Sequence, residues 1–182
     1  MSKCRAALNK PRPKERKDMD IKDFRESKYF TFEGACPLWD TSRASIYVDL
    51  PGTEKSAEYL GSFIDDINVR LEWLDSHRRV IEDALIEDGM VSLAEDWVQS
   101  LPKEDGEDFY VVEDGQKVCL PITADDFRKS LRLVEAAVCF SGGKALASLE
   151  LYIVCSPDYF AGHCIIATVS SRNKVECKSL AG

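Results

Sequence analysis

The side chains that could perform chemistry include one adjacent imidazole and thiol, His163 and Cys164. Such a pair can form a nucleophilic dyad, because the imidazole can take the proton of the thiol. Successive side chains of a strand point to opposite faces, so these neighbours cannot meet if the segment is extended. His163 could instead serve Cys155 or Cys177 from a neighbouring strand. A structural histidine beside a turn is the favoured interpretation, because no third, orienting group accompanies the pair.

Other motifs that commonly carry chemistry are incomplete in this sequence. A P-loop has a glycine, four residues and then Gly-Lys-Ser/Thr. Here Gly143-Lys144 is followed by Ala145, and Val138 stands at the position of the first glycine. No Gly-x-Ser-x-Gly nucleophile elbow occurs. The sequence has 2 histidines and no Cys-x-x-Cys pair, which disfavours the common zinc sites. We therefore expect neither a metal nor another cofactor.

Acidic residues occur as adjacent pairs, of which Asp65-Asp66 lies in the most informative setting. Neighbours on a helix diverge by about 100°, so such pairs make a solvated face rather than a catalytic dyad. Val69 and Trp73 interrupt this acidic side at a spacing of one helical turn, and Glu72 flanks them. An aromatic anchor ringed by charge is typical of protein interfaces. The favoured interpretation is that this helix lies between layers and both of its faces are packed, because tryptophan is usually largely buried. The alternative is that these five residues form a partner-binding face.

The charge of the chain is negative and unevenly distributed. The whole sequence carries a formal charge of −8. Its first seventeen residues hold seven Lys or Arg and one Glu, which leaves 17 basic and 31 acidic residues, or −14, in the remainder. A surface of that sign disfavours nucleic acid, whose phosphates need cations, and suits a basic protein partner. Nucleic-acid contact stays open only for the basic arm, residues 1–17.

The helices that would position these residues are predicted between Thr53 and Gln99. Apolar residues recur at steps of three and four from Ala57 to Leu74, which is the pattern of an amphipathic helix. Thr53 is expected to cap the first helix and Ser76 the second. Gly89 interrupts the pattern as a glycine after a helix does. The segment therefore forms a helical hairpin or triplet.

Most of the strands are predicted after the helices. Glu113-Asp114-Gly115 and Gly142-Gly143 mark hairpin turns. Thr123 with Asp126 predicts the cap of a short helix. Helices grouped early and strands grouped late indicate an α+β fold, with the helices packed on a mainly antiparallel sheet that ends in a C-terminal meander. The predicted strands are Ala44–Leu50, Phe109–Val112, Gln116–Leu120, Leu133–Phe140, Ala145–Cys155, Cys164–Val169 and Val175–Leu180.

The length of 182 residues suits one domain, predicted over residues 18–182 after a disordered basic arm. The aromatic residues expected to dock on its core near the N-terminus are Phe24, Tyr29, Phe30 and Phe32. No signal-peptide pattern and no run of about 18 apolar residues occurs, so we expect a cytoplasmic protein. The 7 cysteines lack regular spacing and are expected to be reduced core residues.

The C-terminal run from Tyr159 to Ile165, Tyr-Phe-Ala-Gly-His-Cys-Ile, and the ending Leu180-Ala181-Gly182 resemble the closing signature of a bacterial family, domain of unknown function 2262. The segments around Trp73 and Trp97 and the Ile122-Thr123 pair also resemble that family. The resemblance runs from Trp39 to the end of the chain. It implies an α+β fold and a bacterial cytosolic setting, and it carries no catalytic residues.

Three functional hypotheses are compatible with these observations, and one of them is a structural or regulatory subunit whose basic arm contacts nucleic acid. The favoured one is a non-enzymatic binding protein that uses the acidic helical face. By analogy with small acidic proteins that accompany toxins, its partner would be a basic toxin domain, which makes the chain an immunity protein. The alternative is a small hydrolase-like enzyme that uses His163 with a nearby cysteine or carboxylate.

Overall fold

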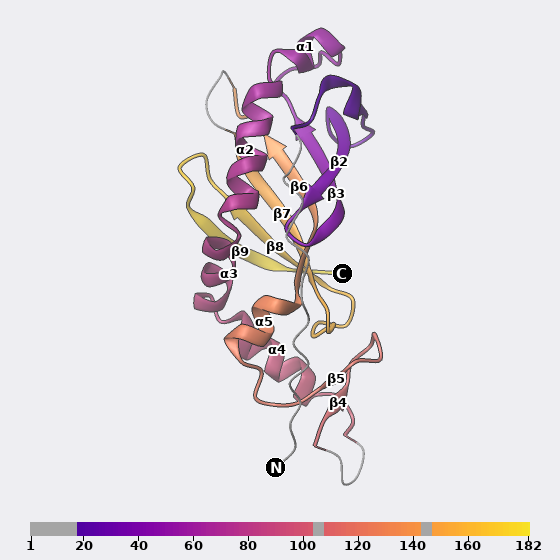
Figure 1. Ribbon diagram of the computed structural model, residues 1–182, viewed down its shortest axis with the longest axis vertical. Coiled ribbons are helices and arrows are strands. Elements are labelled where there is room, and N and C mark those ends of the chain that lie inside the picture. The colour runs from indigo at the N-terminus through magenta and orange to yellow at the C-terminus, as the bar shows by residue number, and fades with distance from the viewer. Residues whose placement is uncertain (1–17, 104–107, 143–146) are drawn as a thin grey trace.

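Runs of alternating apolar residues build a seven-stranded sheet in the order β1-β2-β3-β6-β7-β8-β9 (Figure 1). The computed structural model describes residues 18–103, 108–142 and 147–182. The predicted basic arm and most of the Gly142-Gly143 turn lie outside these residues. The strands are β1 (Phe24–Glu26), β2 (Phe32–Leu38), β3 (Thr41–Asp49), β4 (Tyr110–Val111), β5 (Lys117–Val118), β6 (Leu131–Cys139), β7 (Ser148–Cys155), β8 (Cys164–Val169) and β9 (Val175–Ala181). The helices are η1 (Ile21–Asp23), α1 (Ala57–Gly61), α2 (Ile64–Ser76), α3 (Arg78–Glu87), α4 (Met90–Gln99) and α5 (Ala124–Ser130).

The sheet is antiparallel except where β3 pairs with β6 in parallel. The α1–α4 segment lies in the connection between these two strands, because parallel neighbours need a long crossover. This confirms the α+β prediction with a mainly antiparallel sheet and a C-terminal meander. Strands β1 and β2 and the parallel pairing were not predicted, and that pairing brings the early strand β3 into the middle of the sheet.

The helix boundaries correct two of the predicted caps. Ser56, rather than Thr53, caps α1, and its Oγ accepts a hydrogen bond from the Tyr59 amide at 3.0 Å. Ser76 is the last residue of α2 and donates back to the Glu72 carbonyl at 2.8 Å, so it does not cap α3. A serine hydroxyl can bond an earlier carbonyl of its own helix as readily as it caps the next one. The first predicted helix, which began at Ala57, is divided into α1 and α2, so the segment holds four helices in place of the predicted two or three.

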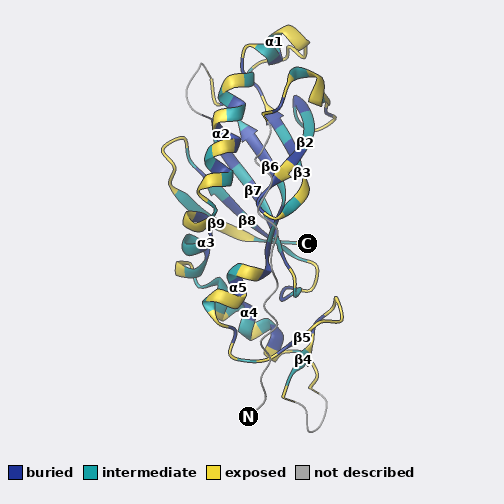
Figure 2. Cartoon of the chain, in the orientation of Figure 1, coloured by how far each residue is buried: buried dark blue, intermediate teal, exposed yellow. Residues whose placement is uncertain are grey.

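The core lies between the helices and one face of the sheet. Along β7 and β8 every second side chain is buried, as the strand period of two requires. The helical stripe of Ile67, Leu71 and Leu74 faces the sheet and is 0% exposed. Each such side chain contributes roughly 1.5–3 kcal/mol through burial. The outward turns of α2 and α3 are exposed, and the central strands are buried or half-buried (Figure 2).

Two predictions about buried residues are wrong, and one buried charged residue was not predicted. Tyr29 does not dock on the core and is 82% exposed. Cys119 is also exposed, whereas Cys36 and Cys155 are buried as predicted. Arg70, on the apolar side of α2, is only 2% exposed although the helical pattern treats arginine as a surface residue. Its guanidinium donates to the Asn173 side-chain oxygen in the β8–β9 turn at 2.7 Å, which joins the helical layer to the sheet.

Candidate binding site

A bulge in β6 turns one carboxylate from the core side of the sheet to the opposite side. Leu133 pairs with Ile153, whereas Glu135 pairs with Tyr152, so two steps on β6 correspond to one on β7. In a regular strand Glu135 would share the buried face with Leu133. The extra residue, Val134, reverses the alternation, and Glu135 becomes half-buried on the face away from the core. Bulges re-aim side chains in this way next to functional sites.

The face of the sheet that carries Glu135 is rich in carboxylates and tyrosines. Tyr47 on β3 and Glu150 on β7 are partly exposed, and their neighbours on either side in each strand are buried apolar residues. Antiparallel sheets commonly keep one such solvated face. We call this surface the open sheet face, and its half-buried residues on β2, β3, β6 and β7 include Glu33, Ala35, Ser45, Tyr47, Glu135, Glu150 and Tyr152.

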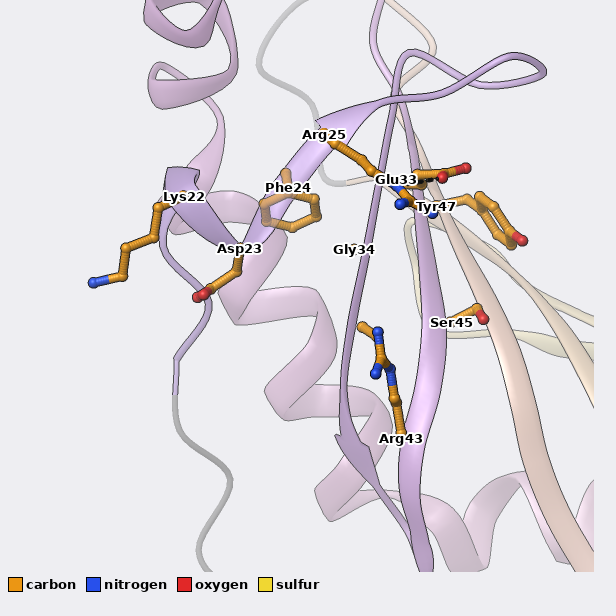
Figure 3. Close-up of a pocket in the computed structure, with 10 residues that line it drawn as sticks. Lys22, Asp23, Phe24, Arg25, Glu33, Gly34, Arg43, Ser45 and Tyr47 are labelled. Carbon is orange, nitrogen blue, oxygen red and sulfur yellow. Dashed lines mark hydrogen bonds and ion pairs between the residues drawn. The ribbon is translucent and has the colours of Figure 1, made fainter.

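The turn between β1 and β2 borders the open sheet face and encloses a pocket of about 630 Å³. This pocket, called here the aromatic–acidic pocket, is lined by Arg25, Glu26, Lys28, Tyr29, Phe30, Glu33, Tyr47, Glu135 and Tyr152. The volume lies in the usual range for ligand sites. A smaller neighbouring pocket of about 380 Å³ shares Arg25, Glu33 and Tyr47 with it. Figure 3 shows Arg25 beside Glu33 there, with Tyr47 and Ser45 projecting from the same side of β3.

Hydrogen bonds from other elements fix the turn that forms the rim. The Lys55 ammonium donates to the carbonyls of Ser27 at 3.1 Å and Phe30 at 3.4 Å. The Thr31 hydroxyl accepts from the Leu50 amide at 3.0 Å, next to the end of β3. Ser27 and Thr31 are buried. The rim is therefore tied to the sheet at both ends, and its aromatic residues are presented by an ordered turn.

The aromatic residues of the pocket come from the turn and from the sheet. The Phe30 ring stacks on Tyr47 with a centroid distance of 4.8 Å and an interplanar angle of 28°. Tyr152 lies directly opposite Glu135 in the β6–β7 ladder. Tyr29 stands exposed at the rim, with the Lys28 ammonium 5.1 Å from its ring centroid. Aromatic faces attract cations, and the Tyr29 ring is already approached by the chain's own Lys28.

The charged groups that line the pocket are three carboxylates, Glu26, Glu33 and Glu135, and two cations, Arg25 and Lys28. Glu33 is already paired with Arg25, whose Nε lies 2.7 Å from the carboxylate. The Glu135 carboxylate makes no hydrogen bond or ion pair with any residue that the structure describes. Burial, followed by the charges of Glu135 and Glu33, raises the pKa of Tyr47. A hydrogen bond to Glu150, with burial, raises the pKa of Tyr152 to about 12. Both phenols therefore stay neutral at physiological pH.

The five residues of the predicted helical face lie together on α2. Asp65 and Glu72 are exposed, Asp66 is half-buried, and Val69 is 53% exposed. Trp73 is half-buried, and its ring stacks on the His77 imidazole at a centroid distance of 4.7 Å. The exposure of Val69 differs from the favoured interpretation that both helix faces are packed, whereas Trp73 is partly packed against the core. Partner binding by this face stays a prediction.

The predicted imidazole–thiol site is not assembled as a dyad. His163 Nδ1 lies 2.9 Å from the Phe160 carbonyl, and the ring makes an edge contact with Trp97 at 5.1 Å between centroids. The Cys164 thiol donates to the Ala181 carbonyl at 3.3 Å. Within the described residues, the hydrogen bonds of the His163 ring go to backbone carbonyls alone. His163 thus has the structural surroundings of the favoured interpretation.

The neighbouring thiols considered as partners for His163 are poorly suited to ionise. Burial raises the pKa of Cys155 to about 12. Burial also raises the pKa of Cys177, and the charge of Asp88 adds to this effect. A thiol must ionise to act as a nucleophile. These surroundings therefore give the enzyme hypothesis no geometric support.

Metal-ligand clusters and membrane-spanning helices are absent from the described parts of the chain. No three His, Cys, Asp or Glu side chains gather there in the manner of a metal site. In the same residues, every helix is too short or too polar to cross a bilayer.

Sequence reasoning missed the aromatic–acidic pocket, although one signal for it is present. Apolar residues in the β6 segment occupy odd positions at Leu131 and Leu133 and even positions at Ala136 and Val138. Such a change of phase within one strand predicts a bulge between the two sets. The contact of Phe30 with Tyr47 leaves no comparable trace, because those residues approach only through the β2–β3 pairing.

Comparison with known proteins identifies the family of this chain, but no individual curated protein or solved structure that matches it. Residues 20–180 match the family described as "Uncharacterized protein conserved in bacteria (DUF2262)". No curated protein and no solved structure matches the chain. The matched residues include the aromatic–acidic pocket, the α2 face and the segment around His163. The chain therefore belongs to the DUF2262 family of uncharacterised bacterial proteins.

Proposed function

We propose that this protein is a non-enzymatic binding module that takes a positively charged segment of a partner protein on its open sheet face. The observation that carries the proposal is the position of Glu135. A bulge turns its carboxylate outward, it lies among aromatic rings, and within the described residues it has no cation of its own. A half-buried carboxylate in such a place is stabilised when a cation joins it.

The overall charge supports a partner of this kind. Residues 18–182 carry a formal charge of −14, from 17 basic and 31 acidic residues. Opposite charge on a partner accelerates encounter and orients it. The tyrosines in the pocket add apolar area with few rotatable bonds, which is why tyrosine is frequent among the residues that dominate binding energy.

A basic toxin domain is a partner with this chemistry, and in that case the protein acts as a cytoplasmic immunity protein. The toxin would present Lys or Arg side chains, because those groups often contact its own anionic substrate. A bound acidic protein would cover them. The open sheet face replaces the α2 face as the principal surface in this proposal, since it combines a defined pocket with an unpaired carboxylate.

The proposal is tested with defined peptides and two charge-reversal variants. Two Gly-Ser peptides of equal length carry either alternating Arg and Lys or alternating Asp and Glu, and binding is measured by calorimetry at low and moderate salt. Glu135→Lys changes the pocket. Asp65→Lys makes the same change of net charge on exposed α2 and is the matched control.

The basic peptide should bind and the acidic one should not. Glu135→Lys should weaken binding by about tenfold or more, whereas Asp65→Lys should change it by less than about threefold, because exposed charges interact weakly across solvent. Equal losses in the two variants would mean a diffuse charge effect and would refute the pocket as the binding site. Failure of the basic peptide to bind the wild-type protein would refute the proposal itself.

A further inference from the structure

We infer that the aromatic–acidic pocket selects one arginine side chain of the partner in preference to lysine. This inference rests on the proposed function and names the group that the pocket would hold. The arginine stands in a segment of a basic protein, so the side chain enters the pocket from a chain that runs along the open sheet face.

The shape of the lining suits a planar cation. Phe30 and Tyr47 present a stacked pair of rings from the rim and the sheet, and Tyr152 stands on the neighbouring part of the sheet. A guanidinium is flat and weakly hydrated, so it can lie against an aromatic face. A lysine ammonium is compact and strongly hydrated, and it loses more on leaving water.

The carboxylate completes the site for a guanidinium. Glu135 projects from β6 beside Tyr152 and has two oxygens free of protein partners within the described chain. Arginine can donate two parallel hydrogen bonds to one carboxylate, which lysine cannot do. A guanidinium–carboxylate pair occurs a few side chains away, where Arg25 Nε donates a single hydrogen bond to Glu33 at 2.7 Å. Glu33 is thus satisfied within the chain, whereas Glu135 lacks an equivalent cation.

The residues of the pocket differ in burial between its floor, formed by the sheet, and its rim, formed by the β1–β2 turn. Glu135, Tyr47 and Tyr152 belong to the sheet and are half-buried, whereas Tyr29 is 82% exposed. A long side chain can reach the carboxylate while its aliphatic stem crosses the rim aromatics. The volume of about 630 Å³ leaves space for the stem as well as the guanidinium.

The test compares three peptides that differ at one position in a Gly-Ser background: arginine, lysine or citrulline. Citrulline has nearly the shape of arginine and no charge. Affinities are measured by calorimetry on the full-length protein. Glu135→Gln removes the charge of the pocket at nearly constant shape, and Glu58→Gln on exposed α1 is its matched control.

Arginine should bind about tenfold more tightly than lysine, and citrulline should show no measurable binding. Glu135→Gln should remove most of the preference for arginine over lysine, and Glu58→Gln should preserve it. Equal affinity for arginine and lysine would overturn this inference while leaving the proposed basic-partner function in place. Binding of citrulline as tight as arginine would also overturn it. Absence of binding to every basic peptide, including the multivalent one, would overturn the proposed function too.

The peptide comparison does not depend on a variant that folds. If Glu135→Gln unfolds, the ranking of the three peptides on the wild-type protein still decides between the two results. Adding free argininamide as a competitor should displace the arginine peptide, because the same group enters the same pocket. Failure of argininamide to compete at any soluble concentration would contradict recognition of the guanidinium itself.

Discussion

Removing the contact between Arg70 and Asn173 should destabilise the protein by an amount that depends on the buried guanidinium. Arg70 is 2% exposed and its Nη1 donates to the Asn173 Oδ1 at 2.7 Å. Its Nη2 donates more weakly to the Ser170 carbonyl at 3.3 Å, and its Nε has no partner within the described residues. Burial disfavours the charged guanidinium and so lowers the pKa of Arg70. The Asn173 oxygen therefore supplies much of the compensation.

The magnitude follows from the type of hydrogen bond. Bonds to a charged group contribute about 1.5–3 kcal/mol, and a buried charge left without its partner costs at least as much. Asn173 has a φ of +64°, so alanine there would add backbone strain, whereas glycine would not. Asn173→Gly should therefore lower the free energy of unfolding by about 1.5–3 kcal/mol. Arg70→Met should cost less than about 1.5 kcal/mol, since it removes the buried charge together with its bonds.

A double-mutant cycle measures this contact without the separate effects of each substitution. Urea unfolding, followed by far-ultraviolet circular dichroism, gives the four free energies. In the Arg70→Met background, Asn173→Gly should change stability by less than about 0.5 kcal/mol, so the coupling energy should be about 1.5–3 kcal/mol. A coupling energy near zero would mean that the guanidinium does not depend on Asn173, and it would contradict the assignment of this bond as the link between α2 and the β8–β9 turn.

Three further predictions concern local features of the fold. Gly34→Ala should destabilise the protein by about 1–3 kcal/mol in the same urea assay, because the added Cβ would lie 2.8 Å from the Asp23 backbone oxygen. An unchanged urea midpoint would contradict that close approach. Thr123→Ala should lower the free energy of unfolding by about 1 kcal/mol, because the α5 cap is lost, and Thr123→Ser should keep the wild-type stability. Equal stability of the alanine and serine variants would contradict the cap. At pH 8, iodoacetamide should label exposed Cys119 at least about tenfold faster than Cys155, which is buried and has its pKa raised to about 12. Peptide mass spectrometry measures the two labelling rates, and comparable rates would contradict the burial of Cys155.

The parts of the fold that depend on neighbours in sequence were predictable. Thr123 caps α5 as predicted, and its Oγ accepts from the Asp126 amide at 3.1 Å. Gly89 has a φ of +84° between α3 and α4, as a glycine at that position in a helical pattern indicates. The predicted limits of β8 agree with the structure, because alternating side chains determine a strand over so short a range.

The parts that depend on distant partners were not predictable in this way. Arg70 is buried because it meets Asn173, which lies 103 positions later in the chain. A helical pattern assigns arginine to the solvent side, and nothing near Arg70 in sequence signals the exception. The parallel pairing of β3 with β6 likewise brings together segments separated by all of α1–α4.

The candidate site falls between these two cases. The bulge at Val134 has a local signal in the change of apolar phase along β6. The pocket itself requires the β1–β2 turn, whose position is set by Lys55 from the segment before α1. Helical periodicity directed attention to the acidic face of α2, because carboxylates on a helix form an evident pattern, whereas Glu135 is a single acid in an apolar strand.

The most direct test of the binding account is a nuclear magnetic resonance titration of the ¹⁵N-labelled full-length protein with the arginine peptide. The account predicts that the amides shifted by the peptide cluster around Phe30, Tyr47, Glu135 and Tyr152, and that Glu135→Gln reduces those shifts at the same peptide concentration. Shifts confined to α2 around Val69 and Trp73, with the resonances of the open sheet face unchanged, would contradict it.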